Sequence, residues 1–468
     1  MYFQQFYLAC LSHASYMIGS EGVAAVIDPQ RDVGIYLEEA AKHGLAIKHI
    51  IETHLHADFV SGHRELAALT GADIYFGATA SAKFPHVPVH DRQQISFGRC
   101  RLQFLETPGH TIESISVLVT DLDRSPNPFA VFTGDTLFIG DVGRPDLSGD
   151  KTPQELAALL FDSLHQKLLK LPETVEVYPA HGAGSLCGKQ LSSERVSTIG
   201  KEKTSNYALQ AKTSDQFVQL ITAELPEKPG YFALDAEINR AGAPSLAELP
   251  PLAAMPPDRV IAAQESGAII LDTRPADQFA SAHVPDSVHI GLSGQFAFWA
   301  AALLGLEKAL VLVAEDDEKV EESRTRLARV GIENVIGYLA DGIAGWTQAG
   351  LPVREAPQIS VQNLNTLLLD EPDAIRVLDV RRPAEWSAAH IPNSMLNPLD
   401  HLASQIGDLD RTSLVVVHCQ GGYRSSIAAS LLLRAGFTQV FDLVGGFDAW
   451  QICNLPCADA ETVSTIKG

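Results

Sequence analysis

The sequence is poor in cysteine, in positive charge and in long apolar runs, and each shortage excludes a class of protein. Six cysteines in 468 residues are too few for the disulfide framework of a small secreted domain. The 35 basic against 57 acidic residues give a net charge of -22, which argues against binding nucleic acid or anionic membranes. No segment approaches the roughly 18 apolar residues of a membrane span. The N-terminal segment lacks a basic head followed by an apolar run, so we expect a cytoplasmic protein with free thiols.

The length is enough for about three domains. In the first block, residues 1–245, short apolar runs alternate with helical stretches, and several runs end at a His or Asp beside Gly or Pro. These runs cover residues 24–28, 48–54, 101–110, 130–138 and 175–181. We expect strands of an α/β domain here, with functional residues at the strand ends.

A linker rich in Pro and small residues, 240–258, precedes an internal repeat. LDTRPADQFASAHVPDS contains Asp272, and LDVRRPAEWSAAHIPNS contains Asp379 at the matching position. Both copies also end with the same Gly-Trp-Pro spacing. Because each copy contains continuous Val and Leu runs, typical of buried parallel strands, we expect two tandem α/β domains at 258–354 and 358–458.

The strand ends of the first block carry residues that bind divalent metals. Imidazole nitrogen and carboxylate oxygen are such ligands, and an HxHxD run lies within THLHADF. A single His at a strand end is more often a hydrogen-bonding residue, but the pattern here is repeated. The candidates are His54, His56, Asp58, His110, Asp135 and His181.

Four separated motifs, THLHADF, TPGHT, TGDTLF and YPAHGAG, resemble the metallo-β-lactamase superfamily in the same order. The resemblance covers about residues 2–240 and implies an αββα sandwich. Within it, THLHADFVSGHREL, GDVGRPDL and DPQRD are most similar to persulfide dioxygenases, which are iron enzymes. Phe59 stands where two-metal members have a histidine, and phenylalanine has no lone pair with which to bind a metal.

The resemblance therefore implies one Fe(2+) per chain, held by two imidazoles and one carboxylate. This set is typical of non-haem iron enzymes that use oxygen. The implied ligands are His54, His110 and Asp135. The residues implied to orient these ligands and the substrate are His56, Asp58 and His181.

Arg144, in VGRPDL, has two interpretations. Its guanidinium suits the anionic end of a substrate, and it lies close in sequence to Asp135. It could equally form a structural salt bridge with Asp141 or Asp146.

The segment LVVVHCQGGYRSS predicts a strand, a tight loop and a helix, with Cys419 at the start of a CxxGxR loop. Backbone N–H groups of such a loop form an anion site that stabilises a thiolate or persulfide. A buried, inert cysteine is the alternative. We expect Cys419 to act as the nucleophile and Arg424 to add positive charge. The loop residues expected to contact substrate are Gln420, Gly421, Gly422 and Tyr423.

The loop, the upstream DVRRPAEWSAAHIP and the ending GGFDAW resemble the rhodanese sulfurtransferase family over about residues 358–457. We expect Asp379, Arg381 and His390 to be framework residues. The first copy reads AEDDEK from Ala314, with four acidic residues and no cysteine. It is expected to be catalytically inactive, with a spacer or docking role.

Together, the resemblances imply an enzyme that oxidises a low-molecular-weight thiol persulfide with O2, giving sulfite and thiol. Sulfur transfer through Cys419 would link sulfite, thiosulfate and the persulfide pool, in sulfide detoxification, and relatives suggest a dimer. The first alternative is a thioester hydrolase like hydroxyacylglutathione hydrolase, with zinc or two metals. The second is a non-enzymatic sulfur relay or sensor.

Overall fold

The computed structural model describes residues 1–149, 151–223, 225, 227–371 and 374–459. The chain forms two compact units: Met1–Leu249 together with Leu327–Gly331 make the first, and most of the chain from Pro250 onward makes the second. Both units are α/β, as expected. Within the described residues, no helix is both long and apolar enough to span a bilayer.

The first unit contains two six-stranded sheets. The strands of the first sheet follow chain order: β1 (Tyr2–Leu8), β2 (His13–Ser20), β3 (Val23–Ile27), β4 (Ala46–Ile51), β5 (Asp73–Gly77) and β6 (Val87–Val89). The second sheet has the order β12-β11-β10-β9-β8-β7. Its strands are β7 (Gln94–Phe97), β8 (Cys100–Glu106), β9 (Ile115–Asp121), β10 (Ala130–Gly134), β11 (Glu176–Pro179) and β12 (Ser197–Thr198).

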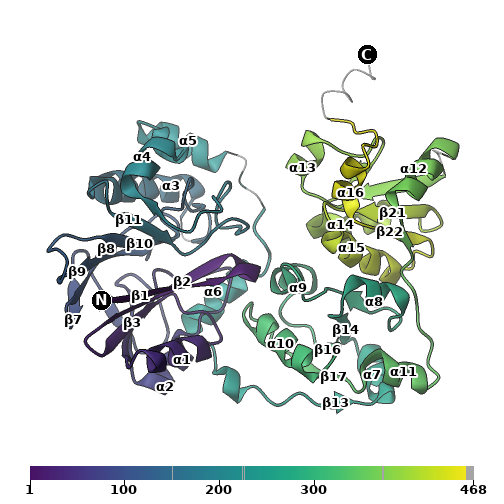
Figure 1. Cartoon of the computed structure of the whole chain (residues 1–468), viewed down its shortest axis with the longest axis horizontal. Coiled ribbons are helices and arrows are strands. Elements are labelled where there is room, and N and C mark those ends of the chain that lie inside the picture. The colour runs from purple at the N-terminus through teal and green to yellow at the C-terminus, as the bar shows by residue number, and fades with distance from the viewer. Residues whose placement is uncertain (150, 224, 226, 372–373, 460–468) are drawn as a thin grey trace. The chain divides into compact units, whose positions relative to one another are not determined.

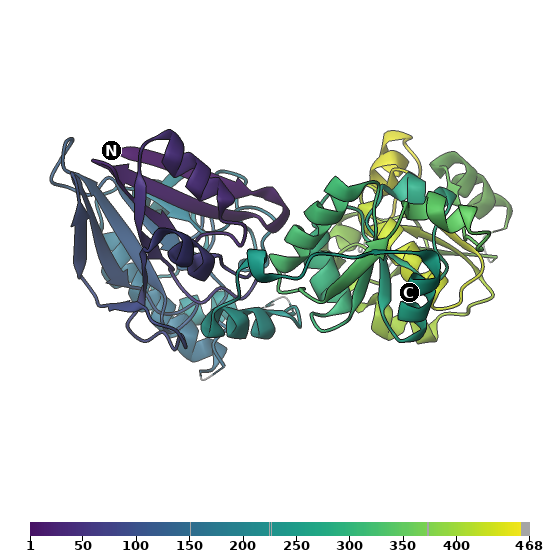
Figure 2. The ribbon, with the colours of Figure 1, turned by 90° about the horizontal axis from the view of Figure 1, so that it is seen from below.

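The two sheets pack face to face over a buried core that includes Tyr16, Ile27, Phe104 and Phe132. Alternate residues of the same strands face outward onto helices. The helices of the unit are α1 (Gly34–Lys42), α2 (His63–Thr70), α3 (Pro153–Asp162), α4 (Ile199–Ser205), α5 (Ser214–Thr222) and α6 (Phe232–Ala241). Figures 1 and 2 show α1 and α2 against the first sheet and α3 to α5 against the second. The expected αββα sandwich is confirmed.

The five expected strands all form, as β3, β4, β8, β10 and β11. Each ends shortly before its His or Asp, so these side chains lie in the loops that follow. β3 is parallel to β4, and β10 is parallel to β11. Because parallel strands end at the same edge of a sheet, these loops gather at one edge of each sheet.

The second unit contains two five-stranded parallel sheets with the same strand order, β13-β17-β16-β14-β15 and β18-β22-β21-β19-β20, which confirms the internal repeat. The middle domain has β13 (Ala254–Met255), β14 (Ile269–Asp272), β15 (Val288–His289), β16 (Leu310–Val313) and β17 (Val335–Leu339). The C-terminal domain has β18 (Gln358–Ile359), β19 (Ile375–Asp379), β20 (Met395–Leu396), β21 (Leu414–His418) and β22 (Val440–Leu443).

Short helices connect these strands. Those of the middle domain are α7 (Pro257–Glu265), α8 (Ala276–Ser281), α9 (Phe296–Leu304), α10 (Asp317–Ala328) and α11 (Gly342–Gln348). Those of the C-terminal domain are α12 (Val361–Asp370), α13 (Pro383–Ala388), α14 (Leu399–Gln405), α15 (Tyr423–Arg434) and α16 (Gly446–Ile452). The segment interpreted as a linker also contributes β13, which pairs with β17.

Each domain of the second unit has a buried ion pair at the end of a central strand. In the C-terminal domain, Arg381 Nη2 lies 2.7 Å from Asp379 Oδ2 and 2.8 Å from the carbonyl oxygen of Ala389. In the middle domain, Arg274 Nη2 lies 2.6 Å from Asp272 Oδ2. The pairs fix the turn after β14 and β19, the framework role expected for Asp379 and Arg381.

Replacing Asp379 by alanine should destabilise the C-terminal domain by about 3–5 kcal/mol, because the Arg381 guanidinium would stay buried without its counter-charge. Hydrogen exchange of peptides from β21 measures this locally. Asp400→Ala, at an exposed position of the same domain, should change the stability by less than about 0.5 kcal/mol. Equal protection of β21 in both variants would contradict the framework role.

Candidate functional sites

Three of the expected metal ligands meet at the edge of the first unit's sheets. His54 follows β4, His110 follows β8 and Asp135 follows β10. One ligand atom from each lies within 4.8 Å of the others. Asp135 Oδ2 is 3.3 Å from His110 Nε2 and 3.8 Å from His54 Nε2. All three side chains are buried.

Contacts behind the two imidazoles set which nitrogen carries the proton. His110 Nδ1 lies 2.9 Å from the carbonyl oxygen of Arg144, which can only accept, so this nitrogen donates. The Thr53 hydroxyl donates to Asp28 Oδ2 at 2.9 Å. Thr53 Oγ1 therefore accepts from His54 Nδ1, 3.0 Å away. Both Nε2 atoms thus keep a lone pair, which is how metal-binding histidines are usually oriented.

These lone pairs fit a metal ion. The two Nε2 atoms and both oxygens of Asp135 are buried without a hydrogen-bond partner, although buried polar atoms are normally satisfied. Burial lowers the pKa of His54 well below its ordinary value and also lowers the pKa of His110. Both rings are therefore neutral, the form that binds metals. Two imidazoles and a carboxylate suit iron(II).

The other expected residues of this region lie beside the three ligands. His181 Nε2 is 3.3 Å from Asp58 Oδ2 and 3.7 Å from Asp135 Oδ1. His56, Asp58 and His181 also place one ligand atom each within 4.8 Å of one another. This second group is therefore close enough to orient the first one, or to hold an ion of its own.

His56 has strong partners of its own. Its Nε2 lies 3.2 Å from Asp28 Oδ1 and 3.4 Å from Glu52 Oε2. Burial alone would lower the pKa of His56, but these two carboxylates raise it well above its ordinary value. The two carboxylates therefore fix the direction of the ring.

Phe59 is buried and forms an apolar wall beside the site. Its ring centroid is 4.1 Å from that of His13 and 4.4 Å from that of His56. His13, on β2, was not singled out from the sequence. It is buried with no hydrogen-bond partner at either nitrogen, and a single His within an apolar strand carries no recognisable pattern.

Helix α6 also reaches this site, which the sequence did not indicate. Asn239 Nδ2 donates to the carbonyl oxygens of His56, at 2.8 Å, and Phe59, at 2.7 Å. Asn239 Oδ1 accepts from the backbone N–H of Ser61 at 2.8 Å. One turn earlier, both carboxylate oxygens of Asp235 are buried without a hydrogen-bond partner. Thus α6 holds the HxHxD loop through its backbone.

Arg144 is buried in an ion pair. Its Nε is 2.7 Å from Asp146 Oδ1 and its Nη2 is 3.0 Å from Asp146 Oδ2. Its Nη1 donates to the carbonyl oxygen of Leu186 at 3.2 Å. Of the two interpretations, this geometry matches the structural salt bridge with Asp146, and contact with substrate stays a prediction.

Cys187 lies beside the metal ligands. Its sulfur is within 4.8 Å of ligand atoms of Asp135 and His181. Burial, with the charges of Asp58 and Asp135, raises the pKa of the Cys187 thiol well above its ordinary value. The thiol is therefore neutral beside the metal ligands.

The thiol site of the C-terminal domain lies between β21 and α15. The backbone N–H of Gly422 donates to Cys419 Sγ at 3.1 Å, and Ser425 Oγ is 3.7 Å from the same sulfur. Gly446 packs directly beneath this loop. A Cβ there would lie 2.5 Å from the carbonyl oxygen of Cys419 and 2.7 Å from that of Gln420. The GGF ending therefore supports the cysteine loop.

The expected substrate-binding side chains of this loop have protein partners. Arg424 Nη1 and Nη2 each lie 2.7 Å from an oxygen of Glu385. Gln420 Oε1 accepts from Arg381 Nη1 at 3.0 Å. Arg424 therefore brings its positive charge to the loop as one half of an ion pair, and its catalytic role stays a prediction.

Tyr423 connects the loop to the middle domain. Its hydroxyl donates to the carbonyl oxygen of Gly291 at 3.0 Å. A Cβ on Gly294 would lie 3.2 Å from the Tyr423 ring, so the middle domain packs closely there. Gly421 is exposed, and substrate contact through Tyr423 or Gly421 stays a prediction.

Strand pairing identifies the middle-domain equivalent of Cys419. Asp272 pairs with Val313, and Asp379 pairs with His418. Ala314, the residue after Val313, therefore occupies the position of Cys419. Alanine cannot carry sulfane sulfur, in agreement with the expected loss of catalysis in this domain.

Gly143→Ala should weaken metal binding about 10- to 100-fold, because it displaces the support of a ligand. A Cβ at this position would lie 1.9 Å from the carbonyl oxygen of Asp135 and 2.9 Å from His110 Nδ1. The measurement is metal content after dialysis against a graded chelator. Gly34→Ala is the matched control, since a Cβ there meets nothing within 4 Å. Unchanged retention in Gly143→Ala would refute this assignment.

Comparison with known proteins gives two family matches. The metallo-beta-lactamase superfamily matches residues 8–181, and the rhodanese-like domain matches residues 256–349 and 360–453. The mitochondrial persulfide dioxygenase ETHE1 of Bos taurus is 30% identical over 223 residues, which cover 46% of this chain and 78% of that protein. A hydroxyacylglutathione hydrolase of Hahella chejuensis is 29% identical over 47% of this chain and 81% of the hydrolase.

A solved structure shares a larger part of the chain. The crystal structure of a metallo-beta-lactamase from Staphylococcus aureus is 32% identical, with a TM-score of 0.65, and the match covers 73% of this chain and 98% of that one. The chain therefore belongs to the metallo-β-lactamase superfamily through a first unit related to persulfide dioxygenases, and it continues into two rhodanese-like domains.

Proposed function

We propose that the first unit oxidises the terminal sulfur of a low-molecular-weight thiol persulfide with O2 at one iron ion. The observation that carries this proposal is the buried set of His54, His110 and Asp135, whose ligand atoms have no protein hydrogen-bond partner. The related persulfide dioxygenase, covered over 78% of its length, supports it. Persulfide, O2 and water give thiol, sulfite and two protons, so the reaction balances without a further reductant.

The chain's own residues prepare the site for this reaction. Iron held by the three ligands would supply O2 activation beside the bound persulfide. Thr53 and the carbonyl of Arg144 hold His54 and His110 with Nε2 lone pairs turned away from these contacts. Phe59 adds an apolar surface that excludes water from one side.

The C-terminal domain would transfer sulfane sulfur. The Cys419 thiolate attacks the outer sulfur of thiosulfate, the S–S bond of thiosulfate breaks, and sulfite leaves with the electron pair. The Gly422 N–H, 3.1 Å from Sγ, stabilises negative charge on the cysteine sulfur. In sulfide detoxification, this step would couple sulfite, thiosulfate and the persulfide that the first unit consumes.

Thioester hydrolysis is the second candidate. The hydrolase relative and the second group of His56, Asp58 and His181 favour it. Phe59 opposes it, because it removes a ligand from the second metal site. The fused rhodanese-like domains also indicate sulfur chemistry rather than thioester chemistry.

Metal analysis and oxygen uptake test the first activity. The purified chain should contain about one iron, the number expected for a single set of two imidazoles and one carboxylate. It should consume O2 when glutathione persulfide is added, and His110→Ala should lose both iron and uptake. His90→Ala, at an exposed loop position, should retain both. A chain with two zinc ions and thioesterase activity would overturn the proposal in favour of the hydrolase.

Cys419→Ser should retain oxygen uptake but lose sulfur transfer from thiosulfate to cyanide by more than about a hundredfold, because a hydroxyl is a much weaker nucleophile than a thiolate. Thiocyanate formation measures the transfer. Cys453→Ser removes an exposed thiol and should leave the transfer unchanged. Transfer that persists in Cys419→Ser would disprove the role of Cys419.

A further inference from the structure

A cavity of about 410 Å³ lies between the middle and C-terminal domains of the second unit. Its lining includes Gly421 and Gly422 of the cysteine loop, together with Asp442 at the end of β22. The middle domain contributes Asp277 and His289. The cavity therefore combines the loop that holds Cys419 with side chains of the domain that lacks a cysteine.

His289, which lines this cavity, carries a hydrogen-bond acceptor without a partner. Its Nε2 lies 2.9 Å from the carbonyl oxygen of Arg274, which can only accept, so Nε2 carries the proton. Burial lowers the pKa of His289, which keeps the ring neutral and leaves a lone pair on Nδ1. That Nδ1 is buried and has no hydrogen-bond partner, a costly state for a polar atom.

Asp442 brings a second acceptor, from the other domain. The residue is 6% exposed, and its Oδ1 has no hydrogen-bond partner. Burial raises the pKa of Asp442 to about 7, and the nearby Ser425 and Gln358 side chains offset this rise only in part. At pH 8 the group is therefore mostly ionised, with no cation beside it among the described lining residues.

The charge of the cavity selects against anions. Asp277 adds a second carboxylate, and none of the described residues that line the cavity is a lysine or an arginine. A ligand that brings hydrogen-bond donors and a positive charge would satisfy both acceptors and offset both carboxylates. An ammonium group has this chemistry.

The cavity shares a wall with the loop that holds the reacting sulfur. Gly422 lines the cavity, and its backbone N–H donates to Cys419 Sγ at 3.1 Å.

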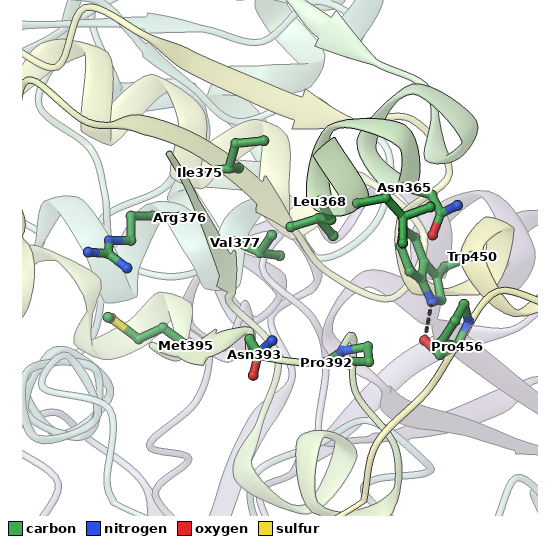
Figure 3. A pocket seen from close by; sticks show the side chains of 11 residues that line it. Asn365, Leu368, Ile375, Arg376, Val377, Pro392, Asn393, Met395, Trp450 and Pro456 are labelled. Atoms are coloured by element: carbon green, nitrogen blue, oxygen red, sulfur yellow. Dashed lines mark hydrogen bonds between the residues drawn. The ribbon is translucent and has the colours of Figure 1, made fainter. Parts of the chain in front are cut away.

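A second cavity, of about 510 Å³, lies in the C-terminal domain and has a more apolar wall (Figure 3). Leu368, Ile375 and Val377 make much of its wall, and Trp450 Nε1 already donates to the carbonyl oxygen of Pro456 at 2.8 Å.

We propose that the cavity between the two domains binds the ammonium end of a small aminothiol, which is the preferred acceptor of sulfane sulfur from Cys419. This inference rests on the proposed sulfur transfer by Cys419 and specifies its acceptor. The middle domain thereby contributes to acceptor choice through His289.

The transfer step balances without an added oxidant. The acceptor thiolate attacks the outer sulfur of the Cys419 persulfide and forms a new S–S bond. The original S–S bond breaks, its electron pair stays on Cys419 as thiolate, and the product is the persulfide of the aminothiol. The proton lost from the acceptor thiol passes to solvent.

Three short thiols of similar length test the proposal on the full chain at pH 8. Cys419 is first loaded from thiosulfate, and loading is seen as one added sulfur in the intact mass, absent in Cys419→Ser. Unloading is then timed with cysteamine, 2-mercaptoethanol and 3-mercaptopropionate, with each rate corrected for thiolate fraction. The persulfide on Cys419 should unload about ten times faster to cysteamine than to 2-mercaptoethanol, as expected for one hydrogen bond to a charged group. Unloading to 3-mercaptopropionate should be slowest.

Two matched variants locate the preference. Asp442→Asn should bring the ratio of cysteamine to 2-mercaptoethanol rates close to one, whereas Asp400→Asn, at an exposed position outside the cavity lining, should keep it. His289→Leu should reduce the ratio in part. If Asp442→Asn does not fold, the unloading rates of the unmodified chain with the three thiols still test whether an aminothiol is preferred.

The outcomes separate the two proposals. A chain that never gains sulfur on Cys419 would overturn the proposed transferase, and this inference with it. A chain that gains sulfur but unloads equally fast to all three acceptors would overturn only the aminothiol site. A preference that survives in Asp442→Asn would also overturn the assignment of this cavity.

Discussion

The buried carboxylate of Asp28 holds the metal-ligand loop in place. Asp28 follows β3 in a left-handed conformation, with φ of 50°, which is uncommon for a residue with a side chain. It accepts from the backbone N–H of Thr53 at 2.7 Å and from its hydroxyl at 2.9 Å. It also lies 3.2 Å from His56 Nε2. One carboxylate thus joins two parallel strand ends and, through Thr53, determines the proton position on His54.

The two candidate sites place their reactive atoms by different means. In the first unit, side chains from several strand ends converge, and each needs a supporting contact, such as the Arg144 carbonyl behind His110. In the C-terminal domain, the backbone provides most of the support. The Gly422 N–H faces the sulfur, and Gly446 allows the GGF ending to pack against the loop. A metal ligand set requires exact side-chain directions, whereas an anion loop requires mainly backbone shape.

The middle domain has no cysteine at the position of Cys419 but has the same fold as the C-terminal domain. The Asp272–Arg274 pair remains buried, and the strand order matches that of the C-terminal domain. A contact of this domain, from the Gly291 carbonyl, binds Tyr423 beside the cysteine loop. The middle domain therefore keeps a framework without a nucleophile and offers a surface to the neighbouring cysteine loop.

The α/β class, the repeat and the order of the metal-type residues can be predicted from the sequence, because strand periodicity and the HxHxD and CxxGxR motifs are local. The partners of isolated side chains emerge only in the folded chain. Cys187 approaches Asp135, and Asn239 holds the HxHxD loop from a distant helix. Strand register, which fixes Ala314 as the equivalent of Cys419, is likewise non-local. The partner of such a side chain depends on which distant segments pack together. A local sequence pattern does not predict that packing.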